Sequence, residues 1–167
     1  MKLTTKSWLA ILCVFTTILY FLSLNNEFIN FDDDIGITTN PAIKDFSVEG
    51  IFYHFKHFTL GMYMPLTMTC YVFLHKIASL NGSAYHSFQL FVHLMNALLV
   101  FQFLKKLQSN EWIALLVAAA FAIHPLQVES VSWVAALSTP LYACFYLLGL
   151  IAYLDFQEKN TKKHIYW

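Results

Sequence analysis

The sequence has 167 residues, of which 58% are hydrophobic and 17% aromatic, whereas only 12% are charged. Soluble domains carry about 25% charged residues, so this composition places the chain among membrane proteins. Ten basic and ten acidic residues give a formal net charge of zero, which excludes the basic surface that a nucleic-acid-binding protein needs.

The first predicted membrane helix covers residues 7–24, an uncharged run of 18 residues that is long enough to cross a bilayer of about 30 Å. Lys2 and Lys6 precede this run and should stay in the cytoplasm by the positive-inside rule. The run lacks a cleavage site of small residues, so we interpret it as a retained anchor. The segment that follows is therefore predicted to lie outside the cytoplasm.

Residues 25–62 form this predicted external loop, which carries three consecutive carboxylates, Asp32, Asp33 and Asp34. Adjacent like charges repel each other and are costly near a low-dielectric boundary. They are tolerated where water solvates them, or where a cation or a cationic substrate faces them. The cluster is thus either a solvated loop or the acidic mouth of a membrane-embedded active site.

The second half of this loop, residues 50–60, has helical periodicity. Phe52 and Phe55 fall on one face, with Lys56 and His57 elsewhere. This pattern predicts a short amphipathic helix in the membrane interface. A short helix buried against the helix bundle is the alternative, because the polar face is thin.

Four further apolar segments are predicted to lie in the membrane, at residues 64–80, 84–104, 111–123 and 139–154. The second of them contains His86 and His93, which are seven residues apart and therefore roughly on one helical face. No third candidate ligand is in register with them. We therefore interpret His86 and His93 as packed histidines with satisfied ring nitrogens, in preference to metal ligands.

The segment 111–123 is short for a crossing and stops at His124-Pro125. A helix that proline breaks at membrane depth normally lines a cavity or is buried in protein. Glu129 follows closely, and an unpaired carboxylate there is expensive, so a partner is expected. His124 is the candidate partner, either in a structural hydrogen bond that locks the broken helix or as part of a site.

The lysines constrain the topology. If every apolar segment crosses, Lys105, Lys106 and the lysines near the C-terminus fall outside, which contradicts the positive-inside rule. If either 64–80 or 111–123 only dips into the membrane, the C-terminal lysines move inside. His124 can then lie on the same face as the carboxylates, and we prefer this second version.

Several short motifs follow one another along the chain. They are Asn30-Phe31-Asp32-Asp33-Asp34, Thr39-Asn40-Pro41, Pro65-Leu66-Thr67, Tyr85-His86, His93-x-x-Asn96, Phe121-Ala122-Ile123-His124-Pro125 and Val128-Glu129-Ser130-Val131-Ser132-Trp133-Val134. Their order and spacing resemble the N-terminal membrane part of the transmembrane-and-TPR protein O-mannosyltransferase family and its bacterial relatives. That family belongs to the GT-C class of glycosyltransferases, which use polyprenyl-phosphate sugars. The resemblance covers residues 24–155, and the combination of the last motif with the acidic loop is fairly specific.

The resemblance implies an all-α fold, a polytopic transmembrane helical bundle of GT-C type with an external loop that carries short amphipathic helices. It implies a polyprenyl-phosphate sugar donor, and a protein Ser/Thr or a glycan or lipid as acceptor. It places the protein in a bacterial inner membrane, in contact with membrane lipid, with the acidic loop on the periplasmic side. It also implies that this chain is incomplete, because the family continues through more membrane helices and commonly a TPR region.

The resemblance puts the catalytic carboxylate in the acidic loop. Asp33 is our first choice as general base, Asp32 the second and Asp34 the third. The same carboxylates could hold the acceptor or a divalent cation, although no set of metal ligands is predicted. The candidate substrate contacts are His124, Glu129, Tyr63 and His93. For Tyr63 the alternative is a place in the aromatic belt of the interface.

The chain departs from the family pattern at positions that are usually charged, which hold Met64, Leu137 and Thr139. Phosphate recognition needs cationic or strong donor groups. The alternative function is therefore a non-catalytic relative that binds polyprenyl lipid or scaffolds a membrane complex. A small transporter or channel subunit is a third hypothesis, which lacks the support of any pore-lining repeat.

Overall fold

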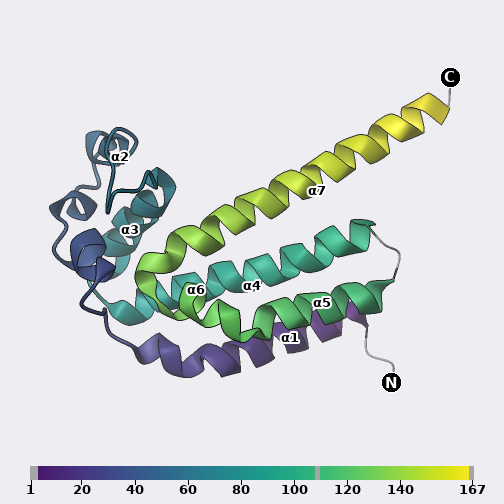
Figure 1. Cartoon of the computed structure of the whole chain (residues 1–167), viewed down its shortest axis with the longest axis horizontal. Helices are drawn as coiled ribbons and strands as arrows, with labels where there is room; N and C mark the ends of the chain where they lie inside the picture. The colour runs from purple at the N-terminus through teal and green to yellow at the C-terminus, as the bar shows by residue number, and fades with distance from the viewer. Residues whose placement is uncertain (1–3, 108–109, 166–167) are drawn as a thin grey trace.

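The computed structural model describes residues 4–107 and 110–165, with side chains up to Lys159, and the regular elements of these residues are helices, with no strand among them. The elements in chain order are α1 (Thr5–Tyr20), η1 (Phe21–Asn25), η2 (Asp34–Thr38), η3 (Pro41–Lys44), α2 (Val48–His54), α3 (Pro65–Ala78), α4 (Gly82–Leu107), α5 (Glu111–Ile123), η4 (Pro125–Gln127), α6 (Val128–Ser132), η5 (Val134–Leu137) and α7 (Ser138–Ile165). Figure 1 shows their arrangement. The predicted all-α class is confirmed, including the short helices after the first long one.

Three helical stretches among the described residues are long and apolar enough to cross a membrane: Thr5–Asn25, Gly82–Leu107 and Val134–Lys159. A fourth crossing is available if α5 and the stretch Pro125–Ser132, which meet at a bend of 52°, count as one broken span. This break lies at His124, immediately before Pro125. α3 has 14 residues and is not among the three stretches.

The long helices alternate in direction (Figure 1). α1 and α5 run toward the end of the bundle that carries α2 and α3, whereas α4 and α7 run away from it. At the opposite end, the Thr5 hydroxyl donates to Glu111, Lys105 forms an ion pair with Glu111, and Lys106 forms one with Asp155.

Lys105 and Lys106, in the last turn of α4, therefore lie at one end of the bundle, next to Glu111 and to Asp155 of α7, and the acidic loop lies at the other end. This arrangement agrees with the topology in which residues 64–80 do not cross the membrane, because each lysine-bearing end is then on the cytoplasmic side. Whether that segment enters the membrane stays a prediction.

Small residues bring α5 close to its neighbours. Ala114, Ala118 and Ala122 repeat every fourth residue, and all three are 0% exposed. They pack in a cluster that includes Leu12 of α1 and Phe101 of α4. Small side chains at this spacing let membrane helices approach closely, which is how helices associate where lipid offers no hydrophobic driving force.

We expect the substitution Ala118→Leu to lower the free energy of unfolding by about 1–2 kcal/mol, because three extra carbon atoms have no space at a fully buried contact. The matched control is Ala120→Leu, which makes the same change at an exposed position of the same helix. The measurement is the thermal unfolding midpoint of the purified protein in detergent. Equal midpoints for the two variants would show that the contact tolerates bulk.

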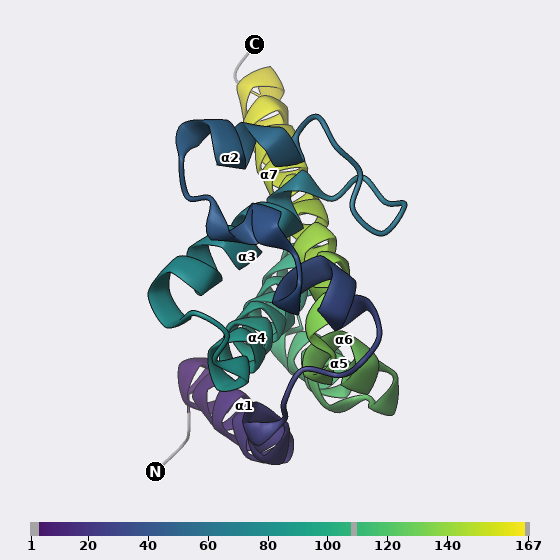
Figure 2. The same cartoon turned by 90° about the vertical axis from the view of Figure 1, so that its left-hand side faces the viewer.

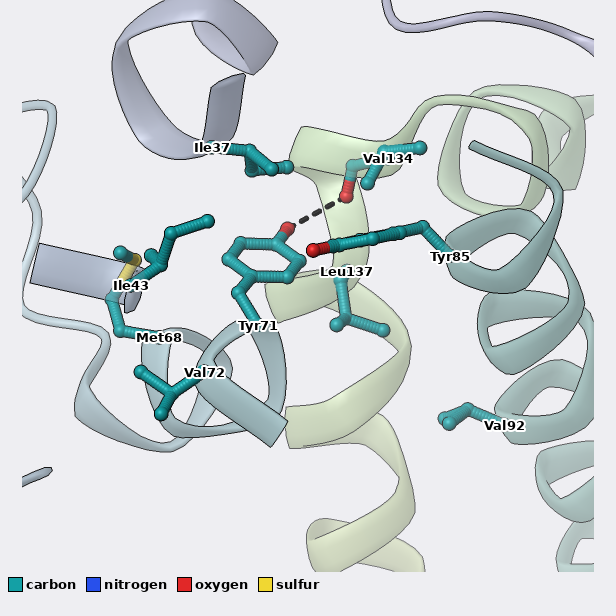
Figure 3. Close-up of a cluster of buried hydrophobic side chains, with 9 residues drawn as sticks. All are labelled: Ile37, Ile43, Met68, Tyr71, Val72, Tyr85, Val92, Val134 and Leu137. Carbon is teal, nitrogen blue, oxygen red and sulfur yellow. Dashed lines mark hydrogen bonds between the residues drawn. The ribbon is translucent and has the colours of Figure 1, made fainter. Parts of the chain in front are cut away.

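A second core lies beneath the acidic loop (Figure 3). It joins residues from the loop, α3, α4 and η5, namely Ile37, Ile43, Met68, Tyr71, Val72, Tyr85, Val92, Val134 and Leu137. The Tyr71 hydroxyl donates to the carbonyl oxygen of Val134 at 2.7 Å. The loop is therefore anchored to the chain that follows the broken helix, and this contact positions the site.

Polar side chains on α4 donate to backbone carbonyls from the end of α5 to the first turn of α7. Gln89, His93 and Asn96 lie on one face of the helix, and each is 1% exposed. The acceptors are Ser130 O and Trp133 O for Gln89 Nε2 (2.7 and 2.6 Å), Ala122 O for His93 Nε2 (2.9 Å) and Pro140 O for Asn96 Nδ2 (2.8 Å). Non-helical backbone at membrane depth needs such partners, because lipid offers none.

Candidate functional site

A pocket of about 290 Å³ lies where the acidic loop meets α4 and the chain around α6 and η5. We call it the acid pocket, and its lining residues are Asn26, Glu27, Phe28, Ile29, Asp33, His86, Ser132 and Trp133. They come from three of the regions that carry the family-like motifs. The fold thus brings together residues that are far apart in the sequence.

Asp33 is the buried carboxylate of this pocket, with an exposed fraction of 1%. Its Oδ2 accepts a hydrogen bond from the N–H of Ile29 at 3.0 Å, and its Oδ1 accepts one from the N–H of Ala135 at 2.8 Å. These two bonds fix the carboxylate between the loop and η5. A carboxylate has about four acceptor sites, so Asp33 keeps capacity for a ligand.

Burial raises the pKa of Asp33 above its ordinary value of 3.8. The backbone hydrogen bonds from Ile29 and Ala135 and the nearby His86 lower the pKa by less, and the charge of Asp32 raises it again. A raised pKa makes the ionised form a stronger base, which is the property a general base needs.

His86 and Trp133 are two further residues with polar groups that line the acid pocket. His86 is 2% exposed, and neither of its ring nitrogens has a hydrogen-bond partner among the described residues. The peptide groups of Asn26 and Glu27 lie next to the ring without reaching hydrogen-bond geometry. The Nε1 of Trp133 is likewise buried and unpaired within the described part of the chain. Buried polar atoms are usually hydrogen-bonded. Three of the eight buried side-chain atoms without a partner among the described residues belong to His86 and Trp133, so the acid pocket is a candidate site for a ligand.

Residues 26–29 form one wall of the acid pocket. Asp33 and His86 are almost wholly buried, whereas Asn26 and Glu27 are exposed. The N–H of Ile29 ties this segment to Asp33, so the carboxylate helps to fix the wall of the pocket that it lines.

The other two carboxylates of the cluster lie outside the acid pocket. Asp32 is partly exposed beside it, and its charge acts on Asp33. Asp34 opens η2 and accepts a hydrogen bond from the hydroxyl of Thr38 at 3.2 Å. Of the three, Asp33 is the buried one, and it lines the acid pocket together with His86.

His124 and Glu129 are both exposed, and neither lines the acid pocket. His124 Nδ1 accepts the N–H of Leu126 at 3.2 Å, so the ring caps the turn that follows it. Among the described residues no hydrogen bond joins His124 to Glu129, so the expected pairing is not found there. The acidic loop instead contacts the chain a few residues further on, at Ala135.

His93 and Tyr63 also lie away from the acid pocket. His93 donates to the backbone and stacks on Phe121 with ring centroids 5.4 Å apart, which fits a packing histidine. Tyr63 is exposed, and its hydroxyl donates to the carbonyl oxygen of Phe55 at 3.1 Å. Tyr63 lines a different cavity, described next.

A second cavity, of about 420 Å³, lies between the start of α3 and the first turns of α7. We call it the apolar groove, and its lining residues are Tyr63, Met64, Pro65, Leu66, Thr67, Ser138, Leu141, Tyr142 and Phe145. None of these residues is cationic. Met64 lies in the groove, Leu137 is buried in the core beside it, and Thr139 is exposed.

Sequence reasoning did not select His86, Ser132 or Trp133 as site residues. His86 was interpreted as a packing histidine, and the Val128–Val134 motif was considered mainly for Glu129. The available signal was the resemblance itself, which includes both motifs. No group of three His, Cys, Asp or Glu side chains that could hold a metal ion gathers among the described residues.

The helices and the acid pocket together define an integral membrane protein of several helices, with a buried carboxylate at one end of its spans. It is 25% identical over 157 residues to the human "Protein O-mannosyl-transferase TMTC1", an alignment that covers 86% of this chain and 17% of that protein. For the mouse protein of the same name the identity is 26% over 162 residues, with 89% and 16% covered.

This chain is therefore a distant relative of these transferases, and it spans about a sixth of the length of the curated relatives it matches. No family model matches the chain. No solved structure matches it at a significant level.

Proposed function

We propose that this chain is the membrane portion of a GT-C glycosyltransferase that transfers a sugar from a polyprenyl-phosphate donor to a hydroxyl group of a protein or glycan. The observation that carries the proposal is the acid pocket. It combines a buried carboxylate of raised pKa with the unpaired polar atoms of His86 and Trp133. The distant relationship to proteins named O-mannosyl-transferases supports the choice of reaction.

In this proposal the acceptor hydroxyl enters the acid pocket and Asp33 removes its proton. The acceptor oxygen forms the new bond to the anomeric carbon of the sugar, and the bond from that carbon to the phosphate oxygen breaks. The polyprenyl phosphate leaves with the electron pair. The two N–H groups that hold Asp33 keep the carboxylate in one orientation, which a general base requires.

The proposal places the acidic loop on the external side of the membrane, periplasmic in a bacterial inner membrane. What supports this side is the position of Lys105 and Lys106 at the opposite end of the bundle, since lysines that flank membrane helices are favoured in the cytoplasm. A polyprenyl-phosphate sugar presented from that leaflet would reach the same end of the protein as the acid pocket.

The test is a transfer assay with the full-length protein that carries this chain. The substrates are a radiolabelled polyprenyl-phosphate sugar, a mannosyl donor first because of the relatives' names, and a Ser/Thr-containing acceptor peptide. Wild-type protein should label the peptide, whereas Asp33→Asn should not. Equal labelling by the two proteins would remove Asp33 from the mechanism.

A second function is favoured by the apolar groove. Its residues could hold a polyprenyl chain, yet Met64 occupies a position where the resembled family carries a cation, and no cationic side chain lines the groove. An apolar groove without a cationic side chain is sufficient for a non-catalytic protein that binds polyprenyl lipid or scaffolds a complex around it. Labelling of the protein by a photoreactive polyprenyl phosphate, without sugar transfer, would favour this second function.

A further inference from the structure

The chain between α2 and α3 forms a tight hairpin. Thr59 and Met62 exchange two backbone hydrogen bonds, at 3.0 and 2.9 Å. Leu60 and Gly61, the two residues between them, have φ angles of 53° and 71°. Positive φ at both central residues is the geometry of a two-residue hairpin turn, so this segment has a defined shape.

Large apolar side chains on this hairpin and on the outer face of α2 point away from the protein. Phe58 is 71% exposed, and its ring lies 5.9 Å from that of Tyr63, centroid to centroid. Phe52 is 58% exposed, and its ring lies 6.2 Å from that of Phe55. We call residues 52–63 the aromatic finger. Such a cluster of exposed apolar side chains indicates a surface that contacts a membrane or another protein.

The aromatic finger continues an exposed apolar flank of α7. The apolar groove at its base is lined on one side by Tyr63 and Leu66 and on the other by Tyr142 and Phe145 of α7. Those two α7 side chains are exposed, and they belong to a candidate span of which only 17% is buried. Figure 2 shows the hairpin extending sideways past α7 at the acid-loop end of the bundle.

We propose that the aromatic finger inserts into the boundary between headgroups and acyl chains of the bilayer leaflet at this end of the protein. Phenylalanine and tyrosine side chains are favoured at that depth, where apolar rings meet water. The exposed Lys56 and His57 lie between the aromatic residues and would face the lipid phosphates. This proposal stands apart from the transfer reaction, because it concerns lipid contact alone.

The test uses the full-length protein reconstituted in vesicles of phosphatidylcholine and phosphatidylglycerol. Phe58→Trp adds a fluorophore to the aromatic finger, and the spectrum of the wild-type protein is subtracted. The expected result is a blue-shifted emission that loses intensity when the phosphatidylcholine carries bromine atoms near the headgroup. The control is Lys44→Trp, at an exposed position of η3, whose emission should be unaffected by bromine.

Two outcomes would overturn the proposal. Emission of the added tryptophan at the wavelength of a water-exposed side chain would place the aromatic finger in solvent. Blue-shifted emission without quenching by brominated lipid would show that protein covers it. Met62→Trp, on the other strand of the hairpin, repeats the measurement if Phe58→Trp unfolds at a lower temperature than the wild-type protein.

Discussion

Replacing Asp33 by asparagine is expected to lower kcat/KM for the acceptor about 10²–10⁴-fold in the full-length protein, the range that general-base catalysis contributes. Asparagine has nearly the same shape but cannot take the proton of the acceptor hydroxyl. The raised pKa of Asp33 makes the loss larger, because the carboxylate is a stronger base than an ordinary aspartate. The measurement is the initial rate of sugar transfer at several acceptor concentrations.

The matched control is Asp34→Asn, which makes the same change at the next residue, outside the acid pocket. Asp34→Asn should keep most of the transfer rate. In Asp33→Asn, the side-chain NH2 group faces the N–H of either Ile29 or Ala135, so one of the two hydrogen bonds that the carboxylate accepts is lost. This loss can lower stability as well as activity. The rates are therefore compared per folded protein, from the unfolding midpoint of each variant. A wild-type rate in folded Asp33→Asn would contradict the base assignment.

The same carboxyl group gives a prediction for pH. Because the base must be ionised, transfer should fall as the pH is lowered, with a midpoint above 3.8, and Asp33→Asn should lack this dependence.

The contribution of Asp33 to the free energy of unfolding has the opposite pH dependence. A raised pKa means that the folded state binds the proton more tightly than the unfolded state does, so this contribution is full below pH 3.8 and is lost as the pH rises through the raised pKa. Unfolding midpoints of the two proteins across that window check it.

Gln89→Leu is expected to lower the free energy of unfolding by about 2–3 kcal/mol. The Gln89 amide donates to two backbone carbonyls, of Ser130 and Trp133, and leucine leaves both without that donor inside the bundle. Trp133 lines the acid pocket, so its displacement should reduce sugar transfer as well.

The control for this variant is Gln102→Leu, the same substitution at an exposed position of α4. Thermal unfolding in detergent compares the two variants with the wild-type protein. If Gln102→Leu lowers the midpoint as much as Gln89→Leu, loss of a polar side chain from α4 explains the effect, and the carbonyl contacts do not.

Hydropathy predicted the long helices because their length and lack of charge depend only on local sequence. The segment predicted at 111–123 coincides with α5. The helix predicted at 84–104 runs from Gly82 to Leu107, since Lys105 and Lys106 continue it as its last turn. The amphipathic helix predicted at 50–60 ends at His54 instead, because aromatic side chains at this spacing suit a hairpin as well as a helix.

The site was harder to predict, because its defining contacts are between distant parts of the chain. Asp33 ranked first among the three carboxylates, but its burial depends on the N–H of Ala135, which no local pattern indicates. The role of His86 was missed for a similar reason. A histidine in an apolar helix is usually interpreted as a buried side chain whose ring nitrogens are hydrogen-bonded. Only the fold shows that the ring nitrogens of His86 lack partners among the described residues. His124 was linked to Glu129 by proximity in sequence, whereas its ring caps its own turn.

The hydrogen bond between Asp33 and Ala135 joins residues 102 positions apart, which has a consequence for biosynthesis. Ribosomes make proteins from the N-terminus, and contacts of high sequence separation form last. Until residues around Ala135 have been synthesised, Asp33 lacks one of its two backbone donors and the core beneath it lacks Val134 and Leu137. In the proposed topology, the acidic loop reaches the external compartment well before its pocket is complete, and it must remain hydrated during that interval.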